Sequence, residues 1–232
     1  MRHEKHTHDL STIFDLVEIE PDNIGRRSYT NMKPFNLDFR YRKSKTPDDK
    51  MHGPGVYQIF FFGTLIYVGK FDTLNNGNVA KERWRKHLET ITMRGYHLGF
   101  TSPDTVTALI CLMTNNALRK SLEVEKRKLA TRLKDTGTVS SRNRIAFANR
   151  NWAKFSKLKS KLPAGMFTVD YYRFTRIRTD RKAQEIANQL EGTLIAKYKP
   201  QCNREYSQDE PSKDATNRQV ATFTEMLIQN MS

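Results

Sequence analysis

The sequence has little cysteine and no long apolar run. Cys111 and Cys202 are its only cysteines, and neither belongs to a CxxC pair. This excludes a disulfide-built secreted scaffold and a cysteine-ligated zinc site, and it favours a reducing, intracellular compartment. No apolar stretch approaches the roughly 18 residues of a membrane span, and the first residues lack the hydrophobic segment of a signal peptide. We therefore expect a soluble, cytoplasmic protein without a membrane partner.

Acidic residues are also scarce relative to basic ones. The chain has 25 Asp and Glu against 40 Lys and Arg, which gives a formal net charge of +15. Such an excess favours a polyanionic partner, because each phosphate neutralised by Lys or Arg releases condensed counterions. Ribosome association or a membrane surface would give a similar balance, so charge alone does not select one partner. Hydrophobic residues make up 37% of the chain, which is enough for a core and excludes wholesale disorder.

The N-terminal quarter is predicted to be peripheral. Residues 10–19 indicate a short amphipathic helix that is stopped by Pro21, and residues 22–52 are a polar, basic arm. We interpret the polar end that precedes them, with its three histidines, as disordered. The amino-acid composition changes at Gly53, after which β-branched and aromatic residues become frequent.

The remaining elements follow from hydrophobic periodicity and from turn residues. The predicted elements are a β-hairpin with strands at 55–62 and 65–68, a helix from Asn78 to about Arg94, at least one helix within 104–134, a strand at 166–177, a helix at 181–198 and a last short helix near 220–227.

A basic tract at residues 141–161 has seven positive charges and no acidic residue. Aromatic side chains are interleaved with these charges, notably Phe147, Trp152 and Phe155. Cations can contact phosphates while aromatic rings stack on bases, so the tract favours a nucleic-acid surface over a merely solvated face.

Glu191 stands out in the helix at 181–198. It shares a face with Ala187 and Ile195, four residues before and after it, and an unpaired buried carboxylate is very costly. Glu191 should therefore bind a metal or pair with an arginine at the core edge. Gly192 follows it, although a helical glycine costs about 1 kcal/mol relative to alanine, which suggests a close approach to the backbone.

Four further candidate site residues each have a common structural explanation when they are considered singly. Tyr57 and Tyr67 fall in paired strands, where aromatic residues usually pack. Arg83 and His87 lie one helical turn apart, where a surface charge and a satisfied core histidine are the common explanations.

Taken in order, however, these residues resemble the motif set of the GIY-YIG nucleases. Gly55-Val56-Tyr57 is followed after ten residues by Tyr67-Val68-Gly69-Lys70, with Val in place of each Ile of the signature. Arg83 resembles the arginine of the family's first helix. The segment that begins with Glu191 continues through Leu-Ile and Tyr-Lys-Pro to Asn203, as the family's catalytic segment does.

The resemblance covers roughly residues 53–95 and 166–203 and implies an α+β fold. We expect a small three-stranded antiparallel sheet that is flanked by helices, with a largely helical basic insertion. The expected segments are an N-terminal helix and basic arm at 1–52, a catalytic domain at 53–203 with a DNA-binding insertion at 96–165, and a C-terminal linker and short helix at 204–232.

The resemblance also implies a role for each matched residue. Glu191 would bind one divalent metal, Mg²⁺ or a substitute such as Mn²⁺, and no second carboxylate is evident. Tyr57 would act as general base with the help of the neighbouring Lys70, and Arg83 would hold the scissile phosphate. The remaining roles are orientation of the water or phosphate by Tyr67, bracing by Asn203, and base or phosphate contact by His87. The insertion would contact double-stranded DNA through Arg142, Arg144, Arg150, Trp152, Lys154 and Lys157.

The implied activity is phosphodiester hydrolysis, and the chain most resembles a stand-alone type II restriction endonuclease of the family. Few residues follow Asn203, which leaves little room for the separate DNA-binding domain of homing enzymes. Cleavage of both strands of a palindromic site would imply a homodimer. A low-specificity nicking or phage-type endonuclease, or a non-catalytic nucleic-acid-binding protein, remains open. The recognition sequence and the cut position are not encoded in these patterns.

Overall fold

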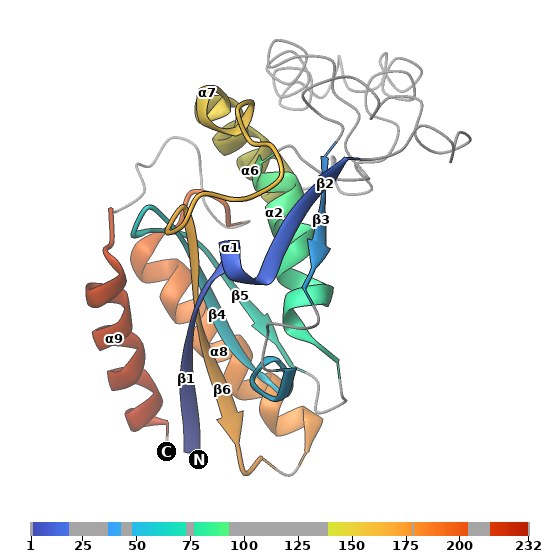
Figure 1. The fold of residues 1–232 in the computed structure, drawn as a ribbon. Helices are drawn as coiled ribbons and strands as arrows, with labels where there is room; N and C mark the ends of the chain where they lie inside the picture. The colour runs from blue at the N-terminus through green and yellow to red at the C-terminus, as the bar shows by residue number, and fades with distance from the viewer. Residues whose placement is uncertain are drawn as a thin grey trace, which may run out of the picture. The chain divides into compact units, whose positions relative to one another are not determined.

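A computed structural model describes residues 2–18, 37–42, 48–72, 77–92, 139–177, 179–203 and 214–231 (Figure 1). It is an α+β structure, as predicted, with a four-stranded and a two-stranded sheet. The chain divides into two compact units. Unit 1 consists of Met1–Phe14, Tyr41–Trp84 and Leu162–Ser232, and unit 2 consists of Asp15–Arg40 and Arg85–Lys161.

The sheet of unit 1 is antiparallel with strand order β1-β6-β4-β5. Its strands are β1 (Arg2–Asp9), β6 (Phe167–Thr175), β4 (Gly55–Phe61) and β5 (Thr64–Phe71). The predicted hairpin and the predicted third strand are thus confirmed. β4 and β6 lie in the interior of the sheet, which explains why their apolar residues fall on both faces.

The fourth strand, β1, corrects the prediction of a three-stranded sheet and of a disordered N-terminal end. The predicted helix at 10–19 is also wrong. Only α1 (Leu10–Ile13) is helical, and β2 (Phe14–Glu18) follows it directly and pairs with β3 (Leu37–Tyr41). β1 contains no apolar residue, so no hydrophobic alternation identifies it as a strand.

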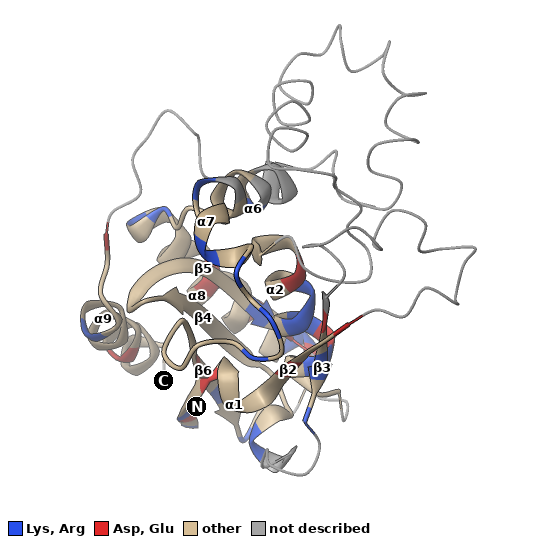
Figure 2. Cartoon of the chain, turned by 45° about the horizontal axis from the view of Figure 1, so that its top comes forward, with Lys and Arg blue, Asp and Glu red and all other residues tan. Residues whose placement is uncertain are grey.

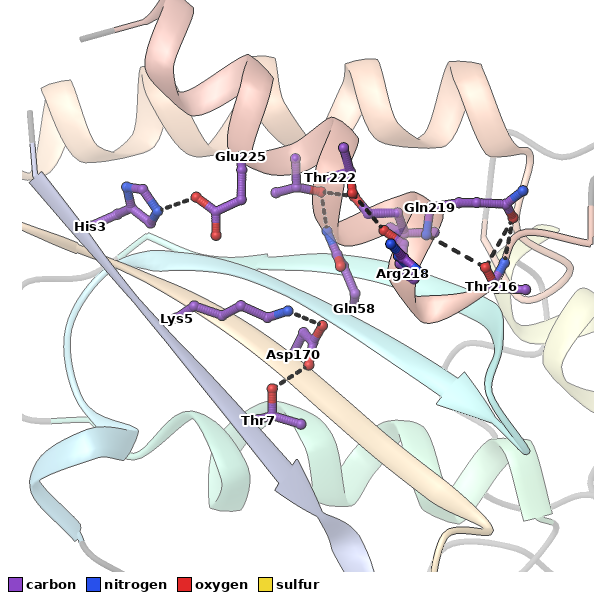
Figure 3. A network of polar contacts seen from close by, with 12 residues as sticks. His3, Lys5, Thr7, Gln58, Asp170, Thr216, Arg218, Gln219, Thr222 and Glu225 are labelled. Carbon is purple, nitrogen blue, oxygen red and sulfur yellow. Dashed lines mark hydrogen bonds and ion pairs between the residues drawn. The ribbon is translucent and has the colours of Figure 1, made fainter.

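Polar contacts instead attach β1 to the sheet (Figure 3). Asp170 on β6 is fully buried, and its carboxylate forms an ion pair with Lys5 at 2.9 Å and accepts a hydrogen bond of 2.7 Å from Thr7. His3 contacts Glu225 of α9 (Asn217–Asn230) at 2.7 Å. Because the partners of β1 on β6 are about 160 or more residues away along the chain, a local pattern could not reveal them.

Helices α8 (Asp180–Tyr198) and α9 cover one face of this sheet (Figure 1). The predicted helix at 181–198 is confirmed, and every member of its apolar stripe is buried. Thr179 caps its N-terminus, and Lys199 ends it in the left-handed conformation just before Pro200. The predicted C-terminal helix is confirmed as α9, which begins with a capping box of Thr216 and Gln219.

The helix predicted after Asn78 is confirmed as two consecutive pieces. Asn78 accepts a hydrogen bond from the Lys81 N–H and caps η3 (Ala80–Trp84), a π-helical turn of unit 1. α2 (Arg85–Thr92) follows in unit 2, where α6 (Val139–Arg150) packs against it and leads to α7 (Trp152–Phe155). The helix expected within 104–134 lies outside the described residues. None of the described helices is long and apolar enough to cross a membrane.

Candidate active site

The site is built on strand β5, where Gly69 lies directly opposite Tyr57 of β4. A Cβ atom on Gly69 would stand only 2.5 Å from Cζ and from the hydroxyl oxygen of Tyr57. The phenol ring therefore crosses Gly69 toward the outer edge of the sheet, and no residue with a side chain could occupy this position without displacing it. The spacing of the two motif segments thus has a steric reason, because the tyrosine of one needs the glycine of the other.

Aromatic packing fixes the Tyr57 ring from its other sides. The rings of Tyr57 and Tyr67 are stacked, with centroids 6.2 Å apart and planes 28° apart. Trp84 of η3 meets Tyr57 edge-on at 6.3 Å and Tyr171 at 5.9 Å. Tyr57 is buried, whereas Tyr67 is half-buried, so the pair extends from the core to the surface.

Arg83 lies next to Trp84 in η3 and is exposed. Within the part of the chain that the structure describes, its guanidinium has no ion pair or hydrogen bond. π-Helical turns are rare and are frequently found at functional sites. Here the turn buries Trp84 against the tyrosines and leaves the neighbouring arginine free to contact an anion.

Lys70 and Glu191 meet on the face of the sheet that α8 covers. Lys70 pairs with Val56, which belongs to the apolar core beneath α8. Its ammonium lies 3.8 Å from the Glu191 carboxylate and donates a hydrogen bond to Asn188. Glu191 is half-buried, with 22% of its side chain exposed, and a lysine of the edge strand is one of its salt-bridge partners.

Tyr57 lies opposite Gly69, the neighbour of Lys70 on β5, so side-chain alternation places Tyr57 and Lys70 on opposite faces of the sheet, near the same edge. The partners of Lys70 all lie on or near the α8 face. This arrangement gives no support to the predicted help of Lys70 in deprotonating Tyr57. It favours a role for Lys70 beside Glu191.

Asn203 binds β5 from its outer side. Its side-chain amide donates to the Val68 carbonyl at 2.7 Å and accepts from the Val68 N–H at 2.8 Å. The preceding Cys202 N–H donates to the Ile66 carbonyl at 2.9 Å. Asn203 is buried, and these bonds hold the edge strand in place, which is the geometry expected of a bracing residue.

Sequence analysis missed Asp72, a second carboxylate at this edge. It lies 4.0 Å from the Lys70 ammonium and accepts a hydrogen bond of 3.4 Å from Gln184 of α8. Its position two residues after Lys70 was the available signal, because residues i and i+2 of a strand share a face. Lys70 thus stands between Asp72 and Glu191.

These oxygens fit a hard divalent cation. Mg²⁺ is usually bound by one or two carboxylates together with water and phosphate oxygens, and Glu191 and Asp72 are both partly exposed. Across the described ranges, no group of three or more His, Cys, Asp or Glu side chains could form an all-protein metal cage. Glu191 is therefore the residue that would hold such an ion, with Asp72 on the other side of the Lys70 ammonium.

Gly192, beside Glu191, is exposed, and a Cβ atom built on it would meet nothing within 4 Å among the described residues. The close approach of another segment that was expected from its sequence position is not found. The surface of α8 next to Glu191 is open instead.

His87 and Arg144 contact each other inside unit 2. The Arg144 guanidinium lies 2.9 Å from Nδ1 of His87, and both side chains are buried. Guanidinium can only donate, so Nδ1 of His87 is the acceptor in this contact. The contact joins α2 to α6, and the assignments of His87 to catalysis and of Arg144 to DNA stay predictions that this packing does not favour.

In Figure 2, which colours Lys and Arg blue, basic positions of the tract lie on α6 and α7. Arg150, Lys154 and Lys157 are exposed, and Trp152 is half-buried. Arg142 is in α6, but its side chain lies outside the described residues. Positive charge and an aromatic ring are therefore present together on α6 and α7, as the sequence pattern predicted.

His8 of β1 is a second residue that sequence analysis missed. Its ring lies 5.6 Å from Trp84, on the sheet face that carries Tyr57. Burial, together with nearby His6 and Lys50, lowers the pKa of His8 to about 4. His8 is consequently neutral at pH 7. No signal marked it, because the polar N-terminal segment did not suggest a strand.

Comparison of the chain with models of protein families found no match. Comparisons with curated proteins and with solved structures found no match either, so the geometry of the site stands on its own.

Proposed function

We propose that the chain is a divalent-metal-dependent DNA endonuclease of the GIY-YIG type. One observation carries this proposal. The four consecutive residues Tyr67–Lys70 contact three other residues of the motif set: Tyr67 and Gly69 contact Tyr57, Lys70 contacts Glu191, and Val68 contacts Asn203. General packing does not require these particular residue types to converge on one edge strand.

The exposed groups at this edge suit phosphodiester hydrolysis. Arg83 presents a planar donor that can bind two phosphate oxygens. Tyr67 extends from the Tyr57 ring to the surface, where a hydroxyl can orient a water or a phosphate oxygen. Glu191, with Asp72 beside it, would hold Mg²⁺, which would supply positive charge against the developing phosphorane and leaving oxygen.

DNA is the substrate that the charge favours, because the net charge of +15 and the exposed part of the basic tract both attract phosphate. Within this proposal, the chain is a site-specific type II restriction endonuclease that reads bases through the segment 96–165. Cleavage of both strands of a palindromic site would then use two copies of the chain.

Incubation with supercoiled and linear plasmid DNA tests the proposal. We expect discrete fragments in Mg²⁺ or Mn²⁺ and intact DNA in EDTA, read by gel electrophoresis and by sequencing of the ends. Nicking or smearing that depends on the metal would retain the chemistry but replace site-specific cleavage by the low-specificity alternative. DNA that is bound but uncut under all metal conditions would contradict the nuclease assignment and favour a binding protein.

The basic tract should contribute a local, salt-dependent part of DNA affinity. We expect the triple replacement Lys154→Gln, Lys157→Gln and Lys159→Gln to weaken binding and to reduce the slope of log K against log salt by up to about 2.7, since each lost phosphate contact removes about 0.9. Fluorescence anisotropy between 50 and 200 mM salt, about the usual range for this effect, measures the slope.

The matched control removes three exposed charges from α8 by changing Arg181, Lys182 and Lys197 to Gln. An equal loss of slope in both triple variants would show that only total charge matters. Unchanged DNA affinity in the Lys154, Lys157 and Lys159 triple variant would show that the basic tract does not contact DNA.

A further inference from the structure

The tip of the β4–β5 hairpin has an unusual residue in its turn. Phe61 pairs with Thr64, so Phe62 and Gly63 form a two-residue loop. Their φ angles are 47° and 80°, which define a type I′ turn. Asn, Asp and Gly are preferred in such turns, whereas the left-handed conformation costs roughly 1–2 kcal/mol for a residue with a Cβ.

Phe62 is also one of two exposed large hydrophobic residues among those the structure describes, at 54% relative exposure. Its ring touches the ring of Phe61 at 4.7 Å, and Phe61 in turn packs on Phe167. Packing therefore uses only part of the ring. A turn residue that is strained and has more than half of its surface exposed points to a function beyond packing.

The tip is held firmly by neighbouring segments. The Phe62 N–H donates to the Met166 carbonyl at 3.0 Å, and the Asn217 N–H donates to the Gly63 carbonyl at 3.1 Å. These bonds fix both turn residues from two sides. The Phe62 ring is thus presented to solvent from a rigid support, which lowers the entropy cost of contact with a partner.

From this placement we infer that Phe62 is a nucleobase-stacking contact, an inference that rests on DNA being the partner in the proposed function. A flat, uncharged ring on a chain with a net charge of +15 matches the face of a base within a polyanion. Phe62 lies five residues along the hairpin from Tyr57, about 16 Å, which is a length of about five nucleotides. One DNA strand can therefore contact both the ring and the candidate active site.

The test compares Phe62→Asn with Phe62→Tyr and the parent. Asn-Gly is a preferred type I′ pair, so the Asn variant should unfold at an equal or higher temperature while its DNA Kd rises about 5- to 150-fold, the range for loss of one stacked base. The Tyr variant keeps an aromatic ring and should bind nearly as the parent does. Anisotropy in EDTA with single-stranded and with duplex oligonucleotides of one sequence gives the Kd values. A loss confined to single strands indicates stacking on an unpaired base, and a loss on duplex indicates a wedge between base pairs.

Met226→Gln is the control, because Met226 on α9 is the other exposed large hydrophobic residue, at 45%. An unchanged Kd for Phe62→Asn, or an equal loss for Met226→Gln, would overturn the inference. So would a change of oligomeric state by light scattering without a change in DNA affinity, since the ring would then contact protein. If the parent and the Phe62→Asn variant bind and cut DNA equally well, only the stacking role of Phe62 is refuted and the proposed function stands. A parent that binds no DNA would refute the proposed function as well.

Discussion

The Glu191→Gln variant is expected to lose cleavage by about a thousandfold or more while it remains folded. The carboxamide has nearly the same size, but it carries no negative charge to hold a divalent cation beside the phosphate. Losses of this order follow when a group that supports transition-state charge is removed. Because 22% of the Glu191 side chain is exposed and its Lys70 contact is long, the melting temperature should change little.

Glu185→Gln is the matched control for this variant, since Glu185 lies on the same helix, is more exposed, and pairs with Arg181 and Lys182 near the helix start. It should cut plasmid at the parental rate. Cleavage by Glu191→Gln at the parental rate would show that Glu191 has no role in catalysis. A loss of activity that accompanies an equal loss of thermal stability would assign Glu191 a structural role instead.

The Asp170→Ala variant is expected to lose about 3 kcal/mol of unfolding free energy. Removing one partner of a buried ion pair typically costs about 3–5 kcal/mol, and the lower value applies because Lys5 is partly exposed and can be rehydrated. Thr7 also loses its acceptor. The melting temperature should fall by roughly 6–12 °C, as measured by circular dichroism.

Glu4→Ala provides the comparison, because Glu4 and Arg173 also join β1 to β6 but at the surface. Exposed pairs contribute little, so this variant should melt close to the parent. Equal melting of Asp170→Ala and the parent would mean that the Lys5 and Thr7 contacts do not hold β1. A larger loss in Glu4→Ala would reverse the order that burial predicts.

The elements that sequence predicted correctly are those with a local periodic pattern. The hairpin of β4 and β5 alternates around a turn, and the apolar stripe of α8 repeats at helical spacing. β1 has no such pattern. Its stability comes from Asp170, Glu225 and the backbone of β6, and nothing in residues 2–9 discloses these partners.

The candidate site was predictable to the extent that motif order identifies residues. The order and spacing of the motifs singled out Tyr57, Gly69, Glu191 and Asn203 as candidate site residues. The structure adds the contacts through which Tyr57, Glu191 and Asn203 meet β5. Motif order did not include Asp72, whose signal was only its position two residues after Lys70. Nor could composition separate Arg144, which is buried against His87, from the exposed cations of the same tract.

The division of unit 1 into three chain segments has a consequence for synthesis. β1 is made before its partner β6, which follows roughly 160 residues later, a delay on the order of 10–30 s at about 5–20 residues per second. Glu191 and Asn203 follow later still. The nascent chain therefore cannot complete its proposed catalytic edge until Asn203 has been translated. The polar composition of β1 leaves no apolar surface exposed on this strand before β6 is made.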